Sequence, residues 1–324
     1  MPGIPGIDKP ISRIVLGTMI LDTDRKEECF AFLDAAYECG INTFDTAAVY
    51  AEGASERCLG MWCAERGLRE KVVILDKGCH QNADRKRVTT FDLAADLHDT
   101  LARLQTNCID LYMLHRDDPS VPVGPIVQAL NEHHKAGRIK AFGVSNWSLH
   151  RIREAIRYAV DHDLQPFAAN SPNYGLAEQV ENPWGPGCTS LSGPDNKADR
   201  DWHIETQMPV FAYSSLGRGL FSGRLLRDNY REIADDVCER AYCHEVNFQR
   251  LDRAMEMARQ KGVSVPQIAL AFVLNSRMNI FALVGAASRE EIEQCVAVRD
   301  IRLSEAELTW LETGSVEPSS PPDS

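Results

Sequence analysis

The chain has 324 residues, of which 44% are apolar and 25% charged, so it is long enough to bury a large core. Its formal net charge is −12 and no long basic stretch interrupts the acidic background, which disfavours nucleic acid and anionic membranes as partners. The ten cysteines form no Cys-x-x-Cys pair, and the longest apolar run, residues 14–21, is too short to span a bilayer. We therefore expect a cytoplasmic protein with reduced thiols and no membrane segment.

The predicted elements alternate along the chain. Short runs rich in Val, Ile and Phe are separated by longer segments whose apolar residues recur at helical spacing. The expected strands are residues 13–18, 42–46, 72–77, 109–115, 140–145, 166–170, 209–214 and 280–285. The helices expected between the first six strands are residues 27–40, 55–67, 91–104, 123–137 and 148–162, and several of them close on a glycine.

Two regions interrupt this alternation. Between residues 174 and 208 the expected helix is replaced or extended by a segment rich in Gly, Pro and Asp. Between residues 214 and 280 an additional helical region precedes the helical patterns at 247–262 and 264–276. Residues 315–324 have no apolar pattern, so we expect them to form a disordered tail.

The alternation predicts an α/β fold. Strands joined by helices should be parallel and buried on both faces. Eight such units without a break in composition favour a single (β/α)8 TIM barrel over residues 1–314, with extended loops at the carboxyl ends of its strands. The alternatives are two domains, which the length alone suggests, and an open doubly wound sheet. No Gly-x-Gly-x-x-Gly motif follows any expected strand, which removes the usual dinucleotide fingerprint of the open sheet.

Polar residues follow three successive strands. Asp45, Lys77 and His115 come at strand ends, and Tyr50 comes five residues after Asp45. Since the carboxyl ends of barrel strands meet at one mouth, these side chains should converge. An ammonium beside a carboxylate favours the phenolate, so we expect a lowered pKa for Tyr50 and a role as proton donor. For each residue taken singly, a helix cap, a solvent-exposed lysine or a loop hydrogen bond is the favoured explanation. Their occurrence together, about one barrel unit apart, favours a catalytic site instead.

The surrounding motifs resemble those of the aldo-keto reductase family. They are GINTFDTAAVYAEGASERCLG (40–60), IDLYMLHRDDP (109–119), GRIKAFGVSNW (137–147) and FAYSSLGRGLFSGRL (211–225), and the resemblance covers about residues 11–311. It implies a barrel that uses a nicotinamide cofactor, with Asp45, Tyr50, Lys77 and His115 as the catalytic tetrad. The implied reaction is reduction of an aldehyde or ketone, including sugar-derived carbonyl compounds, to an alcohol by hydride transfer, with Tyr50 as proton donor.

The resemblance also implies contacts to the nicotinamide. Ser145 and Asn146 match positions that hold its carboxamide, and Tyr213 matches the aromatic residue that stacks on its ring. Many members have a glutamine at the end of strand six, where this chain offers Asn170 or Ser171. The further cofactor contacts that we expect are Gly17, Thr18, Ser214, Leu216, Arg218, Gly285, Ser288, Arg289 and Gln294.

The choice of nucleotide rests on the segment after strand eight. Gly285, Ser288 and Arg289 at a helix start could grip a phosphate through backbone N–H groups and one guanidinium. Family prevalence and Arg289 favour NADPH. The following Glu290 and Glu291 weaken that grip and leave NADH open.

The long interruption supplies candidate substrate contacts. Trp184 and Trp202 are expected to cover a carbonyl substrate at the mouth or to anchor the loop. Adjacent Cys79 and His80 lack further ligands, so no metal is expected, and strand alternation should point Asp76 away from the mouth. The alternative function is a cofactor-binding regulatory or interaction subunit, similar to the potassium-channel β-subunits of this family.

Overall fold

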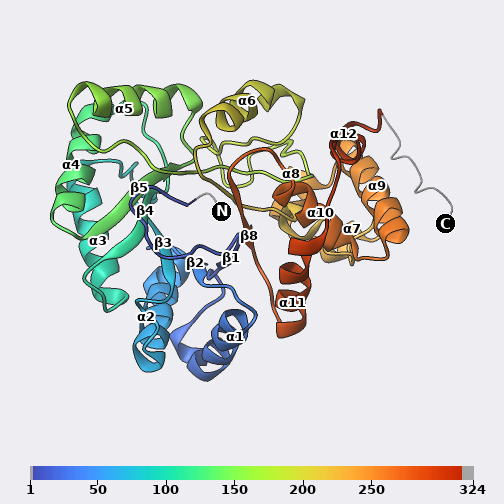
Figure 1. Ribbon diagram of the computed structural model, residues 1–324, viewed down its shortest axis with the longest axis horizontal. Coiled ribbons are helices and arrows are strands. Elements are labelled where there is room, and N and C mark those ends of the chain that lie inside the picture. Colours follow the sequence, from blue (N-terminus) through green and yellow to red (C-terminus); the bar gives the residue numbers. More distant parts are fainter. Residues whose placement is uncertain (1–2, 316–324) are drawn as a thin grey trace.

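The protein folds as a barrel, seen in a computed structural model that describes residues 3–315 (Figure 1). Its eight strands form one closed sheet in chain order, and every paired strand is parallel to its neighbour. They are β1 (Ile14–Gly17), β2 (Thr43–Asp45), β3 (Val73–Gly78), β4 (Ile109–Leu114), β5 (Ile139–Ser145), β6 (Asn170–Ser171), β7 (Val210–Ala212) and β8 (Ile280–Val284). The predicted α/β fold, a (β/α)8 TIM barrel, is confirmed.

Helices surround the sheet. In chain order they are α1 (Lys26–Glu38), α2 (Ala54–Arg66), α3 (Thr90–Arg103), α4 (Val123–Lys135), α5 (Leu149–Asp161), α6 (Lys197–Thr206), α7 (Tyr230–Ile233), α8 (Asp236–Tyr242), α9 (Glu245–Lys261), α10 (Val265–Leu274), α11 (Arg289–Ala297) and α12 (Glu305–Thr313). Capping fixes several starts: the side chains of Thr89, Ser148 and Ser304 each accept a hydrogen bond from the backbone N–H three residues later.

The sixth strand departs most from its prediction. Residues 166–170 were expected to be extended, but β6 is confined to Asn170 and Ser171. Prolines at 166 and 172 bracket this stretch, and proline has no N–H to donate to a sheet ladder. Ala168 still donates a backbone hydrogen bond to Phe142 of β5, so the segment follows the barrel wall without a continuous ladder.

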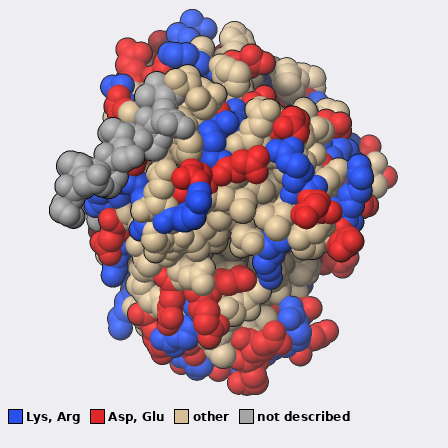
Figure 2. Space-filling view, turned by 90° about the vertical axis from the view of Figure 1, so that its right-hand side faces the viewer, with Lys and Arg blue, Asp and Glu red and all other residues tan. Residues whose placement is uncertain are grey.

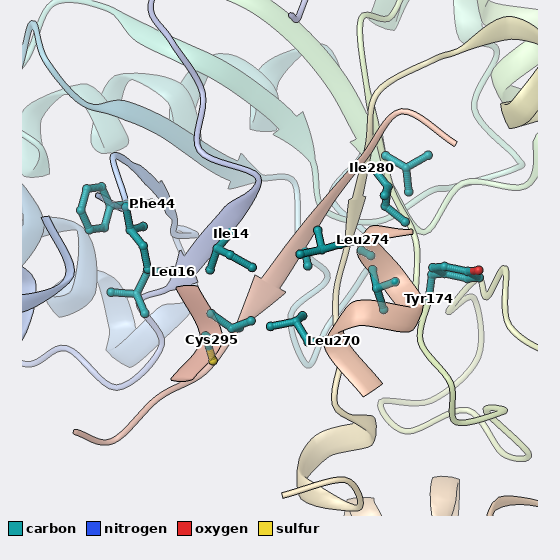
Figure 3. Packing of buried hydrophobic residues seen from close by; sticks show 14 of the residues in the cluster. Ile14, Leu16, Phe44, Tyr174, Leu270, Leu274, Ile280 and Cys295 are labelled. Atoms are coloured by element: carbon teal, nitrogen blue, oxygen red, sulfur yellow. The ribbon is translucent and has the colours of Figure 1, made fainter. Parts of the chain in front are cut away.

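Two apolar layers hold the barrel together. The interior is filled by a cluster that includes Val15, Leu75, Met113 and Phe281, and Ile4 of the N-terminal segment belongs to the same cluster. The second layer lies between strands and helices and is much larger. Figure 3 shows part of it, where β8 faces the apolar side of α10 and β1 lies on the other side of β8. Because the strands are largely apolar on both faces, most of their polar residues lie at or near the strand ends, although Asp76 lies within β3.

The two irregular regions resolve into loops and short helices. Residues 172–196 form the long loop after β6, and α6 follows it, so the expected helix is extended rather than replaced. Helices α7 and α8 precede the predicted α9 and α10. On the face formed by the later helices, acidic and basic side chains are interspersed among the described residues (Figure 2).

The structure also bears on the expected membrane segments, cysteines and domain boundary. Over the described residues, no helix is long and apolar enough to cross a membrane. All ten cysteines lie in that part of the chain and are free thiols. The division into a barrel domain at 1–314 and a tail stays a prediction, and residues 316–324 of that tail lie outside the described residues.

Candidate active site

The four predicted catalytic residues meet at one end of the barrel. Asp45 ends β2, Lys77 lies one residue before the end of β3, and His115 directly follows β4. Backbone hydrogen bonds from Thr46 to Leu75 and from Ala48 to Lys77 hold the loop after β2 against β3. This attachment brings the short 3₁₀ turn that begins at Tyr50 over the lysine.

A buried ion pair forms the centre of this group. Lys77 Nζ lies 2.5 Å from Asp45 Oδ1, and it donates hydrogen bonds to the carbonyl oxygen of Thr46 at 2.9 Å and to Tyr50 Oη at 3.4 Å. Burial by itself lowers the pKa of Lys77, but the Asp45 carboxylate and the Tyr50 phenol outweigh burial and hold that pKa above its usual range. The lysine is therefore charged and aimed at the phenol.

Tyr50 does not have the lowered pKa that the sequence predicted. Burial raises the pKa of its phenol, and the Lys77 ammonium opposes that shift without cancelling it. The Lys77 ammonium lowers the pKa of Tyr50, as the sequence predicted. The cost of burying a phenolate among apolar groups raises that pKa by more. The phenol is consequently protonated near neutral pH, which suits a proton donor.

His115 completes the group as a neutral imidazole. Its ring centroid lies 6.0 Å from that of Tyr50, at an angle of 82°. Burial and the nearby cation of Lys77 lower the pKa of His115 well below its usual range. Its Nδ1 is buried and has no hydrogen-bond partner among the described residues. A neutral imidazole in this position can offer one N–H group to a ligand.

These residues line a cavity of about 890 Å³ at the carboxyl ends of the strands. Of the predicted cofactor contacts, those that line it are Gly17, Ser145, Asn146, Ser171, Tyr213, Ser214, Leu216, Arg218, Gly285 and Gln294. The volume is within the range of ligand pockets. At Gly285 no protein atom of the described residues lies within 4 Å of where a side chain would begin, so a ligand can approach the backbone closely.

A hydrogen-bond network fixes the wall beside the tetrad. Ser145 Oγ donates to the carbonyl oxygen of Ser171 at 2.7 Å. Asn146 donates to the carbonyl oxygen of His115 at 3.3 Å and accepts from Tyr213 Oη at 2.8 Å. Asn146 and Ser214 adopt left-handed backbone conformations, with φ of 60° and 53°. Strain of this kind persists where the surrounding structure enforces it, which is typical of functional sites.

The model of the aldo/keto reductase family matches residues 13–313. The chain belongs to the aldo/keto reductase family. It is similar to protein tas of Escherichia coli, with 27% identity over 95% of each chain. Among solved structures it resembles an aldo/keto reductase from Klebsiella pneumoniae in complex with NADP and acetate, with 27% identity, 95% and 93% coverage and a TM-score of 0.68. It also resembles the glycerol dehydrogenase from Gluconobacter oxydans, with 25% identity, 98% and 97% coverage and a TM-score of 0.77.

Membership of the aldo/keto reductase family confirms the predicted class of enzyme, an NAD(P)H-dependent oxidoreductase. The match spans the barrel from β1 to the end of α12 and includes all the elements that carry the tetrad.

Four predicted cofactor contacts lie outside the cavity wall, namely Thr18, Asn170, Ser288 and Arg289. Thr18 is buried, and its hydroxyl donates to the carbonyl oxygen of Asp45 at 3.0 Å. Asn170 points outward, where its Nδ2 lies 3.1 Å from Nε2 of His203 on α6. Successive strand residues face opposite sides, so Ser171 faces the cavity and Asn170 cannot. Of the two candidates for the family's glutamine, the structure favours Ser171.

The predicted phosphate grip is arranged differently from the expectation. The exposed guanidinium of Arg289 pairs with Glu38 at 2.8 Å and with Glu293 at 3.0 Å, and it does not line the cavity. Ser288 caps α11 by accepting from the N–H of Glu291. The Glu291 carboxylate accepts from the N–H of Ala287 at 2.8 Å, so it occupies a backbone donor that a phosphate would use.

The two tryptophans of the long segment have different environments. Trp184 lies at the cavity, 5.6 Å from the ring of Tyr213, with the guanidinium of Arg218 5.7 Å from its own ring. Trp202, for which the sequence left a substrate contact and a loop anchor open, packs on α6 beside His203 and the outer core, as an anchor would. Its position follows from α6 being a helix of the outer layer, which the sequence did not define.

Several cavity residues were not predicted as contacts, among them the basic side chains of His80, Arg116 and Arg224. His80 stacks edge-on with His115 at 4.8 Å, Arg116 directly follows His115, and Arg224 lies near Glu291. The adjacency of Cys79 and His80 to the tetrad lysine was the only signal in the sequence. Over residues 3–315 no group of three or more His, Cys, Asp or Glu could hold a metal.

Asp76 points away from the cavity, as alternation predicts. It is completely buried, and neither carboxylate oxygen has a hydrogen-bond partner in the described part of the chain. Burial and the neighbouring Glu56 of α2 raise the pKa of Asp76 well above its usual range. This carboxyl is therefore protonated over a wide pH range and takes no part in the cavity.

Proposed function

We propose that this protein reduces an aldehyde or ketone to an alcohol with NADPH, and that Tyr50 donates the proton. The observation that carries the proposal is the position of Lys77 Nζ, 2.5 Å from Asp45 Oδ1 and 3.4 Å from Tyr50 Oη, at the wall of a cavity of about 890 Å³. The Klebsiella pneumoniae relative in complex with NADP supports a nicotinamide nucleotide in this cavity.

The residues present fit such a nucleotide. Ser145, Asn146 and Ser171 are proposed to hold the carboxamide, and the half-buried ring of Tyr213 to lie against the nicotinamide. The proposed contacts to the rest of the cofactor are Gly17, Ser214, Leu216, Arg218, Gly285 and Gln294. When bound, the reduced nicotinamide supplies the hydride that the carbonyl carbon accepts.

The tetrad handles the proton. Tyr50 holds its proton near neutral pH because its pKa is raised, and it gives that proton to the carbonyl oxygen. The neutral His115 offers an N–H group to the same oxygen and orients it. The Lys77 ammonium then stabilises the phenolate, and Asp45 keeps the ammonium in place.

Turnover with a panel of aldehydes and ketones tests the proposal. In Tyr50→Phe, we expect carbonyl reduction to fall by roughly 100-fold or more, while NADPH binding, followed by fluorescence, is retained. The matched control is Tyr37→Phe, because Tyr37 lies on α1 against Trp62 and outside the cavity. Unchanged reduction by a folded Tyr50→Phe variant that still binds NADPH would falsify the mechanism. NADPH binding by the wild type without any turnover would favour the alternative, a cofactor-binding regulatory subunit.

A further inference from the structure

Arg116 is a buried guanidinium at the cavity wall. Its side chain is 7% exposed, and the residue lines the same cavity as the tetrad. Its one side-chain hydrogen bond within residues 3–315 runs from Nη1 to Cys188 Sγ at 3.0 Å. Its Nε is buried without a partner, and no carboxylate of the described residues pairs with it. A thiol is a weak acceptor, so the guanidinium has most of its hydrogen-bonding capacity free.

Other buried arginines of this chain are paired. Arg151 binds Asp117 through two hydrogen bonds, at 3.1 and 3.2 Å. Arg250 binds Glu178 at 3.1 Å and the carbonyl oxygen of Leu176 at 3.3 Å. Burying a guanidinium without an anion is costly, which explains why these two have carboxylates. Among the described residues, Arg116 therefore has no carboxylate partner of the kind that Arg151 and Arg250 have.

The acidic side chains of the cavity do not neutralise Arg116. Within the described residues, the acidic side chains that line the cavity are Asp45 and Glu291. Asp45 is engaged by Lys77 at 2.5 Å, and Glu291 lies on α11 with Arg224 3.9 Å away. Neither carboxylate lies within 4 Å of Arg116, the limit of an ion pair, so a ligand in the cavity can supply its counter-ion.

That ligand is not the proposed nucleotide. Arg116 directly follows His115, so it lies at the catalytic end of the cavity, where the proposed cofactor presents only its uncharged carboxamide and ring. The proposed contacts to the cofactor's charged part include Ser214 and Arg218, and Arg218 already pairs with Asp235 at 2.9 Å. An anion beside His115 therefore belongs to the molecule whose carbonyl group is reduced.

We propose that Arg116 binds a carboxylate or phosphate group of the carbonyl substrate, and that the enzyme prefers anionic aldehydes or ketones. This inference rests on the proposed reductase function. A guanidinium suits either group because its N–H groups match two oxygens at once. Arg116 is thereby a residue that determines substrate specificity, on the element that also supplies His115.

Matched substrate pairs test this preference. The first pair is 4-carboxybenzaldehyde and its methyl ester; the second is glyceraldehyde 3-phosphate and glyceraldehyde. In the wild type we expect kcat/KM for the anionic member to exceed that of its neutral partner by roughly 10- to 100-fold in at least one pair, mainly through KM. The pair that shows the preference identifies the group as a carboxylate or a phosphate.

Variants then assign the preference to the residue. Arg116→Gln should reduce the ratio to about one, and Arg116→Lys should keep part of it, since a lysine retains the charge but not the paired N–H groups. The control is Arg299→Gln, whose exposed side chain lies outside the cavity, and it should leave the ratio unchanged.

Two outcomes separate this inference from the proposed function. If the wild type reduces the neutral aldehydes but shows a ratio near one in both pairs, the assignment of Arg116 is overturned while the reductase stands. If no aldehyde is reduced although NADPH binds, the proposed function itself fails. A folded Arg116→Gln variant that retains the wild-type ratio also overturns the assignment.

Discussion

Replacing Lys77 by methionine removes the ammonium next to Tyr50 while keeping a side chain of similar length. Lys77 Nζ lies 3.4 Å from Tyr50 Oη. Opposite unit charges at that distance attract by about 5 kcal/mol at an effective dielectric constant of about 20. Because one pKa unit corresponds to about 1.4 kcal/mol, the pKa of Tyr50 should rise by up to about 3.5 units in Lys77→Met.

The effect is clearest in alcohol oxidation, because the proposed mechanism then requires a deprotonated Tyr50 to accept the alcohol's proton. The assay is kcat/KM for oxidation as a function of pH with NADP⁺ as the oxidant, since this profile reports the ionisation of the free enzyme. We expect the rise of kcat/KM toward alkaline pH to shift to higher pH, and kcat/KM at neutral pH to fall by up to about 3,000-fold.

Controls separate the shift from a loss of folding. Lys135→Met removes a lysine at the exposed end of α4 and should not change the profile. An unpaired buried carboxylate costs about 3–5 kcal/mol, so Lys77→Met is compared with the double variant Asp45→Asn/Lys77→Met, which removes both charges. A folded Lys77→Met whose profile coincides with that of the wild type would refute the role of the ammonium.

Three further perturbations follow from the structure. Glu291→Gln removes a carboxylate that lines the cavity, so the affinity for NADPH relative to NADH should rise several-fold in a fluorescence titration. Glu290→Gln, outside the cavity, is the control. An equal change of this affinity ratio in both variants would exclude the electrostatic explanation. Asp76→Asn should match the wild type in unfolding free energy below a pH of about 4. The pKa of Asp76 is raised in the folded state, so the wild type loses stability as pH rises toward that pKa. In urea titrations, its unfolding free energy should then drop below that of the variant by up to about 1.4 kcal/mol per pH unit. Parallel pH dependences of the two unfolding free energies would contradict this. Gly143→Ala would place a Cβ 2.3 Å from the carbonyl oxygen of Ala169. It should lower the unfolding free energy by about 3 kcal/mol or more, and a smaller loss would mean that β5 and the β6 segment can separate.

The order of elements could be predicted because strand and helix patterns are local. Residues 109–115 and 280–285 were placed within a residue or two of β4 and β8 because both runs consist mostly of apolar residues. The β6 strand was misplaced because its extent depends on hydrogen bonds to β5 and β7, and not on its own composition. The helix α6 was not defined because residues 197–206 have few apolar positions, and tertiary contacts hold them helical.

In the site, residues at strand ends could be identified in advance because barrel geometry brings consecutive strand ends together. Lys77 and Tyr50 are an example, since motif and spacing sufficed to predict their encounter. The outward direction of Asn170 and the pairing of Arg289 with Glu38 depend on neighbours that are distant in sequence. Such neighbours leave no local pattern in the sequence. For this reason Asn170 and Arg289 were predicted as cofactor contacts, although their side chains do not line the cavity.

By itself, the sequence determined the barrel, the family and the meeting of the four residues that we propose handle the proton, because each depends on local periodicity or on the constant spacing of strand ends. Only the tertiary structure decided how those residues ionise, because burial depends on everything packed around a group. Burial raised the pKa of Tyr50 against the attraction of Lys77. The packing of residues 3–315 also leaves the buried Nε of Arg116 without a hydrogen-bond partner at the cavity wall. The low polarity of such surroundings strengthens the effect of every charge that lacks a partner.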